Sequence, residues 1–225
     1  MNRLPHLSLV CALALALAGC DPHLSGNGVL GVEQRTVPPF DEAEISLGIE
    51  ASITANAATQ TLTISGDENL LQYVLTKVEN KVLKTELSVI NGFDAIHPLR
   101  IVAQAITLHA VRAREASLID VKGAGSTEAG FTFEVGASEG SSVLLQGPGG
   151  DRLQVALAGG SSLDAWAYPV TGADVALAGG SRLRVNSTEN VTGTAADQSL
   201  VEVTGGGTCD ALVLSGGATC RLGPP

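Results

Sequence analysis

The chain is poor in aromatic and in basic residues. Only 3% of its 225 residues are aromatic, and Lys and Arg together number 13 against 23 Asp and Glu. The formal net charge of −10 argues against nucleic acid and anionic lipid head groups as partners, because both repel an acidic surface. The composition therefore excludes nucleic-acid binding and favours solubility away from a membrane surface.

Catalytic and metal-binding motifs are also missing. The sequence contains no GxSxG elbow, no HExxH pair, no DxDxDG loop and no GGxGxD array. His23, His97 and His109 lie far apart in the chain. The glycine-rich stretches 147–150 and 205–207 neither precede a helix nor carry a lysine, as a phosphate-binding loop requires. We expect no catalytic residue, no metal and no cofactor.

The first residues have the pattern of an export signal. Arg3 provides the positive start, and residues 7–17 form an apolar run that is shorter than the roughly 20 residues of a membrane-spanning helix. The run ends in Leu17-Ala18-Gly19-Cys20, which resembles a bacterial lipobox. This resemblance implies that Cys20 becomes the first mature residue and carries lipid, palmitate included, which would give stable anchoring. An ordinary signal peptide with a chance cysteine is the alternative.

A repeat of 20 residues organises the second half of the chain. The segments VALAGGSSLDA at 155–165 and VALAGGSRLRV at 175–185 are near-copies, and a similar unit occupies 135–145. Looser copies follow the same pattern at 119–129, 201–211 and 212–222. Alternating apolar residues predict short strands, and paired glycines suit a corner because they reach positive φ without a Cβ clash. Such repeats predict a solenoid of stacked coils; an antiparallel meander of even hairpins is the alternative.

Before the repeats, the chain alternates apolar and polar residues over several short runs, which predicts strands. Asp67-Glu68-Asn69 is suited to cap a short helix through Val74. Residues 78–89 and 99–113 predict further strands, the second entered through Pro98.

The cysteines fit an exported protein. Cys11 belongs to the leader and Cys20 to the lipid, which leaves Cys209 and Cys220 as a pair. An even pair in an exported chain predicts a disulfide; two buried free thiols are the alternative. Their separation of 11 residues is about half a coil, so the two side chains could face each other across the core.

Charged residues recur at one position of the repeat. Asp164 and Asp210 share this position, and Arg184 and Arg221 occupy it in other copies. Stacked coils would align them as an exposed ladder that keeps strand edges from pairing with other chains. The alternative is the clustered acidic site of a polysaccharide-cleaving enzyme.

Trp166 and Tyr168 lie in the linker between the two best repeats. We expect them to pack against the side of the solenoid; a platform for sugars is the alternative.

Several motifs, taken in their order along the chain, resemble the head GIN domain family of putative auto-transporter adhesins. The matching residues are Ser25-Gly26-Asn27-Gly28, Arg35-Thr36-Val37, Phe40-Asp41, Ile45, Gly48-Ile49, Gly66-Asp67-Glu68-Asn69-Leu70-Leu71, Val78-Glu79-Asn80, Leu83 and Pro98-Leu99-Arg100-Ile101. The resemblance implies an exported, often lipid-anchored domain without an established biochemical function. This chain has Ala-Gly-Gly corners where the family usually has Ser-Gly-Ser-Gly-Asp, and so it lacks a repeated acidic residue.

Together these observations predict an all-β protein, a right-handed parallel β-helix-like solenoid with a β-rich N-terminal part. We divide the chain into a signal peptide at 1–19, a tether at 20–31 and one domain at 32–225, β-rich over about 32–115 and repetitive over about 116–225. The expected function is that of a non-enzymatic cell-envelope lipoprotein, with its domain in the periplasm or at the surface, which binds a glycan or an envelope protein. A structural part of an envelope complex and a carbohydrate-active enzyme are the alternatives.

Overall fold

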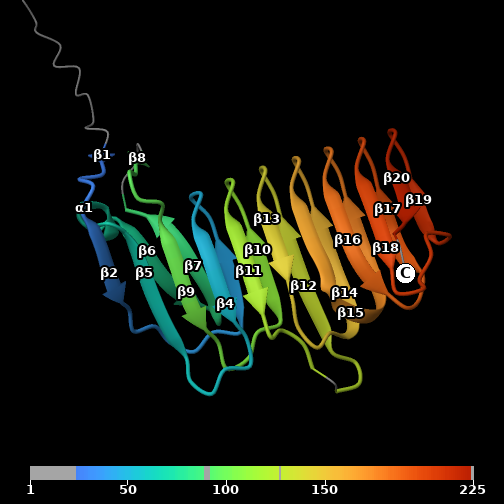
Figure 1. Cartoon of the computed structure of the whole chain (residues 1–225), viewed down its shortest axis with the longest axis horizontal. Coiled ribbons are helices and arrows are strands. Elements are labelled where there is room, and N and C mark those ends of the chain that lie inside the picture. The colour runs from blue at the N-terminus through green and yellow to red at the C-terminus, as the bar shows by residue number, and fades with distance from the viewer. Residues whose placement is uncertain (1–23, 89–91, 127, 224–225) are drawn as a thin grey trace, which may run out of the picture.

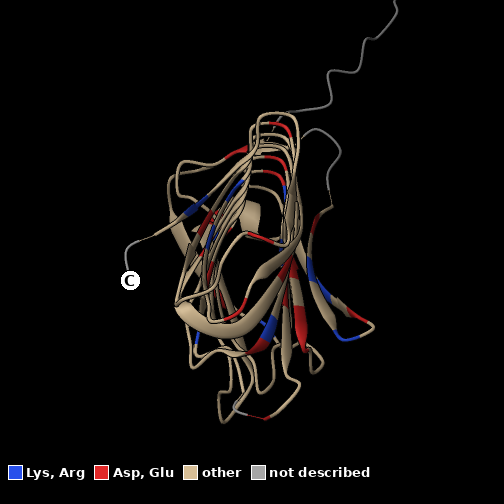
Figure 2. Cartoon of the chain, turned by 90° about the vertical axis from the view of Figure 1, so that its right-hand side faces the viewer, with Lys and Arg blue, Asp and Glu red and all other residues tan. Residues whose placement is uncertain are grey.

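The computed structural model describes residues 24–88, 92–126 and 128–223. The chain winds into an elongated coil in which each turn contributes one strand to each of two faces (Figure 1). Viewed along the coil, the turns superpose as a flattened ring (Figure 2). In the described part of the chain no helix has the length and apolar character needed to cross a membrane. The expected leader and Cys20 lie outside the described residues.

Six turns follow one another from residue 110 onward. Each turn consists of two strands in chain order. The six turns are β10 (Ala110–Ala113) and β11 (Leu118–Lys122); β12 (Thr132–Ala137) and β13 (Ser142–Leu145); β14 (Gly150–Leu157) and the first part of β15 (Ser162–Leu177); the rest of β15 and β16 (Arg182–Ser187); β17 (Val191–Ala195) and β18 (Leu200–Thr204); and β19 (Leu212–Leu214) and β20 (Thr219–Leu222). We call the face made by the first strand of each turn face A and the face made by the second strand face B. The predicted solenoid is confirmed.

Neighbouring turns pair in parallel and in register, so equivalent side chains form columns inside the coil. Val135, Val155 and Val175 stack on face A. Leu163 and Leu183 stack on face B, and all five side chains are buried. Because side chains alternate between the two sides of a strand, the apolar alternation of the repeat fills a continuous core.

The corner between the two strands of a turn is a tight turn with two left-handed residues. Gly159 and Gly160 have φ of 62° and 74°, and Gly179 and Gly180 have 65° and 73°. Successive corners are also bonded to each other, since the Gly160 backbone N–H donates to the Gly179 carbonyl over 2.8 Å. Glycine suits these positions because a Cβ there is strained.

A buried serine follows the paired glycines and closes the corner. The Ser161 hydroxyl donates to the Ala158 carbonyl, and the Ser181 hydroxyl donates to the Ala178 carbonyl, each over 2.7 Å. Both serines are fully buried, so these bonds satisfy polar atoms that water cannot reach.

Two of the looser copies are shifted by half a turn relative to the alignment with the repeat 155–165. Ile119 pairs with Val143, and Val201 pairs with Leu183. Both partners belong to face B, whereas the aligned residue Val155 belongs to face A. The copies at 119–129 and 201–211 therefore begin on the second strand of a turn.

The N-terminal part supplies one more turn, made of β3 (Glu42–Ile45) and β4 (Glu50–Thr54). β3 pairs in parallel with β10, and β4 pairs in parallel with β11. On their other sides lie β7 (Val82–Leu87) and β9 (Arg100–Gln104). The chain therefore leaves the coil after β4, builds the end of the molecule, and returns across this turn to β10. The coil begins earlier in the chain than the glycine corners indicate.

The segment between β4 and β9 closes the N-terminal end. Its other elements are β5 (Thr61–Asp67), α1 (Glu68–Leu71), β6 (Val74–Glu79) and β8 (Phe93–Asp94), joined by β1 (Leu24–Ser25) and β2 (Leu30–Gln34). β2 and β5, and β6 and β7, pair antiparallel. The predicted strand 78–89 includes the turn at Asn80 and Lys81, and Val89 lies outside the described residues.

Two motifs that carry the family resemblance are bonded to each other at this end. The Asn69 side chain accepts from the Asn27 backbone over 2.9 Å and donates to the Ser25 carbonyl over 2.8 Å. The Asp67 carboxylate makes no side-chain cap of α1. Instead it accepts from the backbone N–H groups of Gly28, Ile96 and His97. We call this set of contacts the N-terminal clasp.

Candidate functional site

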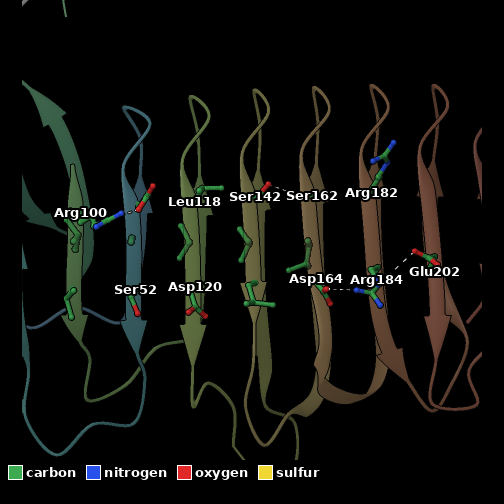
Figure 3. A pocket seen from close by; sticks show the side chains of 18 residues that line it. Ser52, Arg100, Leu118, Asp120, Ser142, Ser162, Asp164, Arg182, Arg184 and Glu202 are labelled. Atoms are coloured by element: carbon green, nitrogen blue, oxygen red, sulfur yellow. Dashed lines mark hydrogen bonds and ion pairs between the residues drawn. The ribbon is translucent and has the colours of Figure 1, made fainter. Parts of the chain in front are cut away.

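An elongated hollow of the surface lies on the outer side of face B. It has a volume of about 630 Å³ and extends over strands from β9 to β18 (Figure 3). Its side chains occupy the strand positions that alternate with the core columns, so the same alternation that builds the core builds this surface. We call it the face-B groove. It lies over Arg100, Leu118, Leu144, Asp164, Arg182 and Glu202, with serines between them.

The centre of the groove is apolar. Val102, Leu118 and Leu144 are exposed large hydrophobic residues; Leu118 and Leu144 lie on neighbouring strands, and β4 separates Val102 from them. Beside them the Ser142 and Ser162 hydroxyls are bonded to each other over 2.8 Å. This bond uses part of the hydrogen-bonding capacity of both serines, so the centre presents mainly aliphatic groups.

A charged row borders the groove toward the C-terminal end. Asp164, Arg184, Glu202 and Arg221 occupy equivalent positions on successive turns. Arg184 Nη1 lies 2.6 Å from Asp164 Oδ2, and Arg221 Nη2 lies 2.8 Å from Glu202 Oε1. The predicted ladder of Asp164, Arg184 and Arg221 therefore exists, and its charges are paired within the chain.

Asp210 does not belong to this row. It lies before β19, where its carboxylate accepts from the Thr208 hydroxyl over 2.9 Å. The prediction was wrong because the copy at 201–211 is half a turn out of phase, and Glu202 takes the expected place of Asp210. Asp164 and Asp210 therefore do not line up in one row, as the alternative of a polysaccharide-cleaving site would require.

Arg182 is the charged residue of the groove that remains available. It stands beside Ser162 on the neighbouring strand and lines the edge of the groove, with its side chain extending toward the corner of the turn (Figure 3). Across the described ranges no hydrogen bond or ion pair engages its guanidinium, whereas Arg100 is paired with Glu50 at 2.8 Å. A planar cation with free donors can bind a carboxylate through two hydrogen bonds.

Face A offers a different surface. Gly136, Ala156 and Ala176 make its middle flat, and Arg112 and Arg114 are paired with Glu42 and Glu44. Arg112 bonds to Glu42 over 2.5 Å, and this hydrogen bond raises the pKa of Arg112 above its usual value. Face A therefore lacks the combination of exposed aliphatic groups and an available arginine that marks the groove.

The two aromatic residues of the linker serve packing, as expected. Tyr168 is fully buried, its ring centroid lies 5.8 Å from that of Phe133, and burial raises the pKa of its hydroxyl. The Arg184 guanidinium lies 4.3 Å from the Trp166 ring centroid. A Cβ added to Gly223 would stand 2.5 Å from the same ring, so the indole is packed against the last turn. Neither ring is presented as a sugar platform.

Both described histidines contact a carboxylate of the chain. His97 Nδ1 lies 2.9 Å from Asp67 Oδ1 in the N-terminal clasp, and His109 Nε2 lies 3.5 Å from Glu42 Oε1. His23 lies outside the described residues. Among the residues whose positions are described, no three His, Cys, Asp or Glu side chains are grouped as metal ligands. The stretch 147–150 connects β13 to β14 and ends on the first residue of β14, and 205–207 lies in the connection between β18 and β19.

A disulfide joins Cys209 and Cys220, whose Cα atoms lie 6.3 Å apart. Cys220 stands on β20 in the column of Leu183 and Val201, as the repeat predicts. Cys209 lies in the connection before β19 and not in that column. The bond therefore crosses the last turn, as expected for a separation of half a coil.

Sequence reasoning missed Arg182 and Glu202 as parts of the surface. Arg182 follows the corner of the repeat 175–185, at the place of Ser162 in the preceding copy. Its signal was a charge among otherwise neutral residues at that position. Glu202 was hidden by the phase error, because the turn between Leu183 and Val201 is two residues shorter than the turn between Leu163 and Leu183.

The fold defines a β-solenoid domain with a groove on one of its two faces. Residues 39–207 match the family described as "Putative auto-transporter adhesin, head GIN domain". Since this match covers well over half of the chain, the protein belongs to that family.

Solved structures share the fold at low sequence identity. A putative adhesin from Bacteroides fragilis aligns with a TM-score of 0.68 and 13% identity, covering 88% of this chain and 98% of that one. A protein described as a putative lipid binding protein from Parabacteroides distasonis aligns with a TM-score of 0.60 and 13% identity, covering 90% and 100%. A putative adhesin from Parabacteroides merdae aligns with a TM-score of 0.51 and 16% identity, covering 90% and 99%. No curated protein matches the chain.

Proposed function

We propose that the protein is a non-enzymatic adhesion module of the bacterial cell envelope, anchored through lipid on Cys20, that binds an envelope protein with the face-B groove. Membership of an adhesin family and the solenoid fold support export and a binding role. The observation that carries the proposal is the groove itself, where exposed aliphatic side chains lie beside the available guanidinium of Arg182.

The chemistry of the groove favours a protein partner over a glycan. Aliphatic side chains bordered by polar and charged groups resemble the core and rim of a protein interface. Sugars are commonly held by exposed aromatic rings, and Trp166 and Tyr168 are both occupied by packing. The expected partner therefore presents an apolar side chain next to a carboxylate, which would pair with Arg182.

Binding is tested by capturing envelope proteins from the source bacterium on the immobilised mature chain. Leu144→Lys and Arg182→Glu should each reduce capture of the same protein at least tenfold. The first replaces an aliphatic contact by a hydrated cation beside Asp120 and Asp164, and the second reverses the charge offered to the partner's carboxylate. The matched control is Ala156→Lys, which adds the same charge to face A and should leave capture unchanged. Equal loss in all three variants, or capture of glycans by the unaltered chain alone, would contradict the proposal.

Anchoring and the absence of catalysis are tested separately. Cys20→Ser should move the protein from the membrane to the soluble fraction, and a membrane-bound variant would refute the anchor. The mature chain should leave envelope polysaccharides uncleaved, and cleavage lost in Asp164→Asn would instead favour an enzyme.

A further inference from the structure

The C-terminal end of the coil leaves its core columns open. Leu222 follows Val203 and Val185 in one column, yet it is 61% exposed where they are 1% and 0% exposed. Leu214 ends the column of Leu177 and is 43% exposed. These leucines occupy core positions, and they are exposed because no further turn covers them within the described residues.

The same end presents two unpaired strand edges. β19 pairs with β17 and β20 pairs with β18, each on one side only in the described part of the chain. The opposite end differs, because α1 and the antiparallel pairs β2–β5 and β6–β7 close it (Figure 1). Terminal turns of solenoids usually carry a polar cap, since an open edge pairs readily with another chain.

This open end is held in shape. The disulfide between Cys209 and Cys220 crosses the last turn, and the Gln198 backbone N–H donates to the Gly216 carbonyl over 2.9 Å. The edges are therefore pre-organised, so they lose little conformational entropy when a partner pairs with them.

The end is also electrically neutral. Residues 205–223 contain one acid, Asp210, and one base, Arg221, in a protein of net charge −10. Arg221 is moreover paired with Glu202 at 2.8 Å. An identical end can approach without the like-charge repulsion that the rest of this acidic surface would impose.

We propose that this end binds the same end of a second copy, so that β19 and β20 of one molecule pair with their counterparts in the other. A second copy fits better than a single extended peptide, because it supplies two edges at the same spacing and a second open core. The contact spans only one cross-section of the coil and falls below the roughly 1,000 Å² of stable interfaces, so the dimer is weak.

The position of this end gives the dimer a role that rests on the proposed anchor. β1, where the described chain begins, and the open end lie at opposite extremes of the molecule (Figure 1). If Cys20 is held in a membrane, the open end faces away from it. Weak contacts between many anchored copies would then join two facing membranes through multivalency.

The test uses the mature chain with Cys20→Ser in sedimentation equilibrium and small-angle scattering, over roughly 10 μM to 1 mM, the range expected for a small interface. An elongated dimer should form toward the upper end. Leu222→Arg and Val213→Lys should each abolish it without changing the thermal midpoint, whereas Val102→Arg in the groove should leave it intact. A monomer throughout, or a dimer insensitive to Leu222→Arg, would overturn the proposal.

Cross-linking distinguishes the geometry. Val213→Cys should form a disulfide-linked dimer with itself, while Val32→Cys at the other end should not. Cross-links between these two variants in a mixture, with none within either, would show head-to-tail stacking and also overturn the proposal. Neither result depends on the partner of the face-B groove, so the proposed function stands or fails on its own experiment.

Discussion

The two ends of the coil solve the same physical problem differently. A stack of turns must cover the apolar columns that it exposes at each end, because an isolated turn cannot bury its own apolar face. At the N-terminal end Leu70 and Leu71 of α1 are fully or almost fully buried. At the C-terminal end Leu214 and Leu222 remain exposed. Among the described residues, closure is therefore built into the N-terminal end, whereas the C-terminal end has unpaired strand edges.

The closed end depends on polar contacts as well as on burial. The side chain of Asp67 has no exposed surface and holds Gly28, Ile96 and His97 together. Gly26 is required beside it, since an added Cβ would lie 2.5 Å from Asp67 Cγ. The clasp thereby holds residues 25–28, which the sequence assigned to the tether, against the domain.

The largest expected effect comes from truncating a leucine at each end. Leu71→Ala should lower the free energy of unfolding by about 2–5 kcal/mol, because it opens a cavity in the closed end. Leu222→Ala should lower it by less than about 1 kcal/mol, because the side chain is already largely hydrated. Urea denaturation followed by circular dichroism at low micromolar concentration measures both. Equal losses would mean that the C-terminal end is covered.

The second effect concerns the disulfide. The paired substitutions Cys209→Ser and Cys220→Ser should cost roughly 3 kcal/mol, the value expected for a closed loop of about this length. The loss should be local, with faster hydrogen exchange over β19 and β20 and unchanged exchange over β2 and β5. Uniformly faster exchange would show that the last turn supports the whole coil. Reduction of the unaltered protein is the matched control and should reproduce the variant.

The third effect is a pH dependence that belongs to the closed end. Burial raises the pKa of Asp67, but hydrogen bonds from the His97 side chain and from the backbone of His97, Ile96 and Gly28 outweigh it, so the pKa lies below its ordinary value. A carboxyl whose folded pKa is depressed stabilises the fold above its unfolded pKa and loses that contribution as the pH falls through the folded value.

The thermal midpoint of the unaltered protein should therefore fall below about pH 4, as the carboxylates of the native state are protonated. Asp67→Asn should have a lower midpoint at pH 7 and a shallower fall in acid. Asp174→Asn on face A is the control and should follow the unaltered curve. If Asp67→Asn kept the full acid sensitivity, the clasp would not be its source.

The comparison also shows what the sequence could predict. Alternation and paired glycines predicted the coil because they mark strand positions and positive φ directly. They failed at residues 197–206, where the corner uses Asp197 and Gln198 with φ of 54° and 62° while Gly205 and Gly206 lie in the opposite connection. Glycine signals a backbone conformation and not a place in the turn, so the phase was lost there. Glu202 and the true place of Asp210 were lost with it.

The closed end was less predictable for a different reason. Its strands pair antiparallel and through contacts between residues far apart in the sequence, such as Asn27 with Asn69. No local pattern encodes such a pairing. The groove shares this limit, because Leu118 and Leu144 become one surface only when the turns are stacked in register.

The smallest effect tests whether the corner chemistry differs along the coil. Ala116 is the second residue of its corner and has φ of 59°, whereas the equivalent Gly160 has 74°. An alanine in the left-handed conformation costs about 1 kcal/mol, and Ala116→Gly removes this cost. Glycine also increases the conformational entropy of the unfolded chain, which offsets part of the gain. The free energy of unfolding should therefore rise by a few tenths to about 1 kcal/mol. Gly160→Ala is the reverse change in the middle of the coil and should lower it by about as much. If Ala116→Gly destabilised the protein, the N-terminal corners would owe their shape to side-chain contacts and not to backbone conformation.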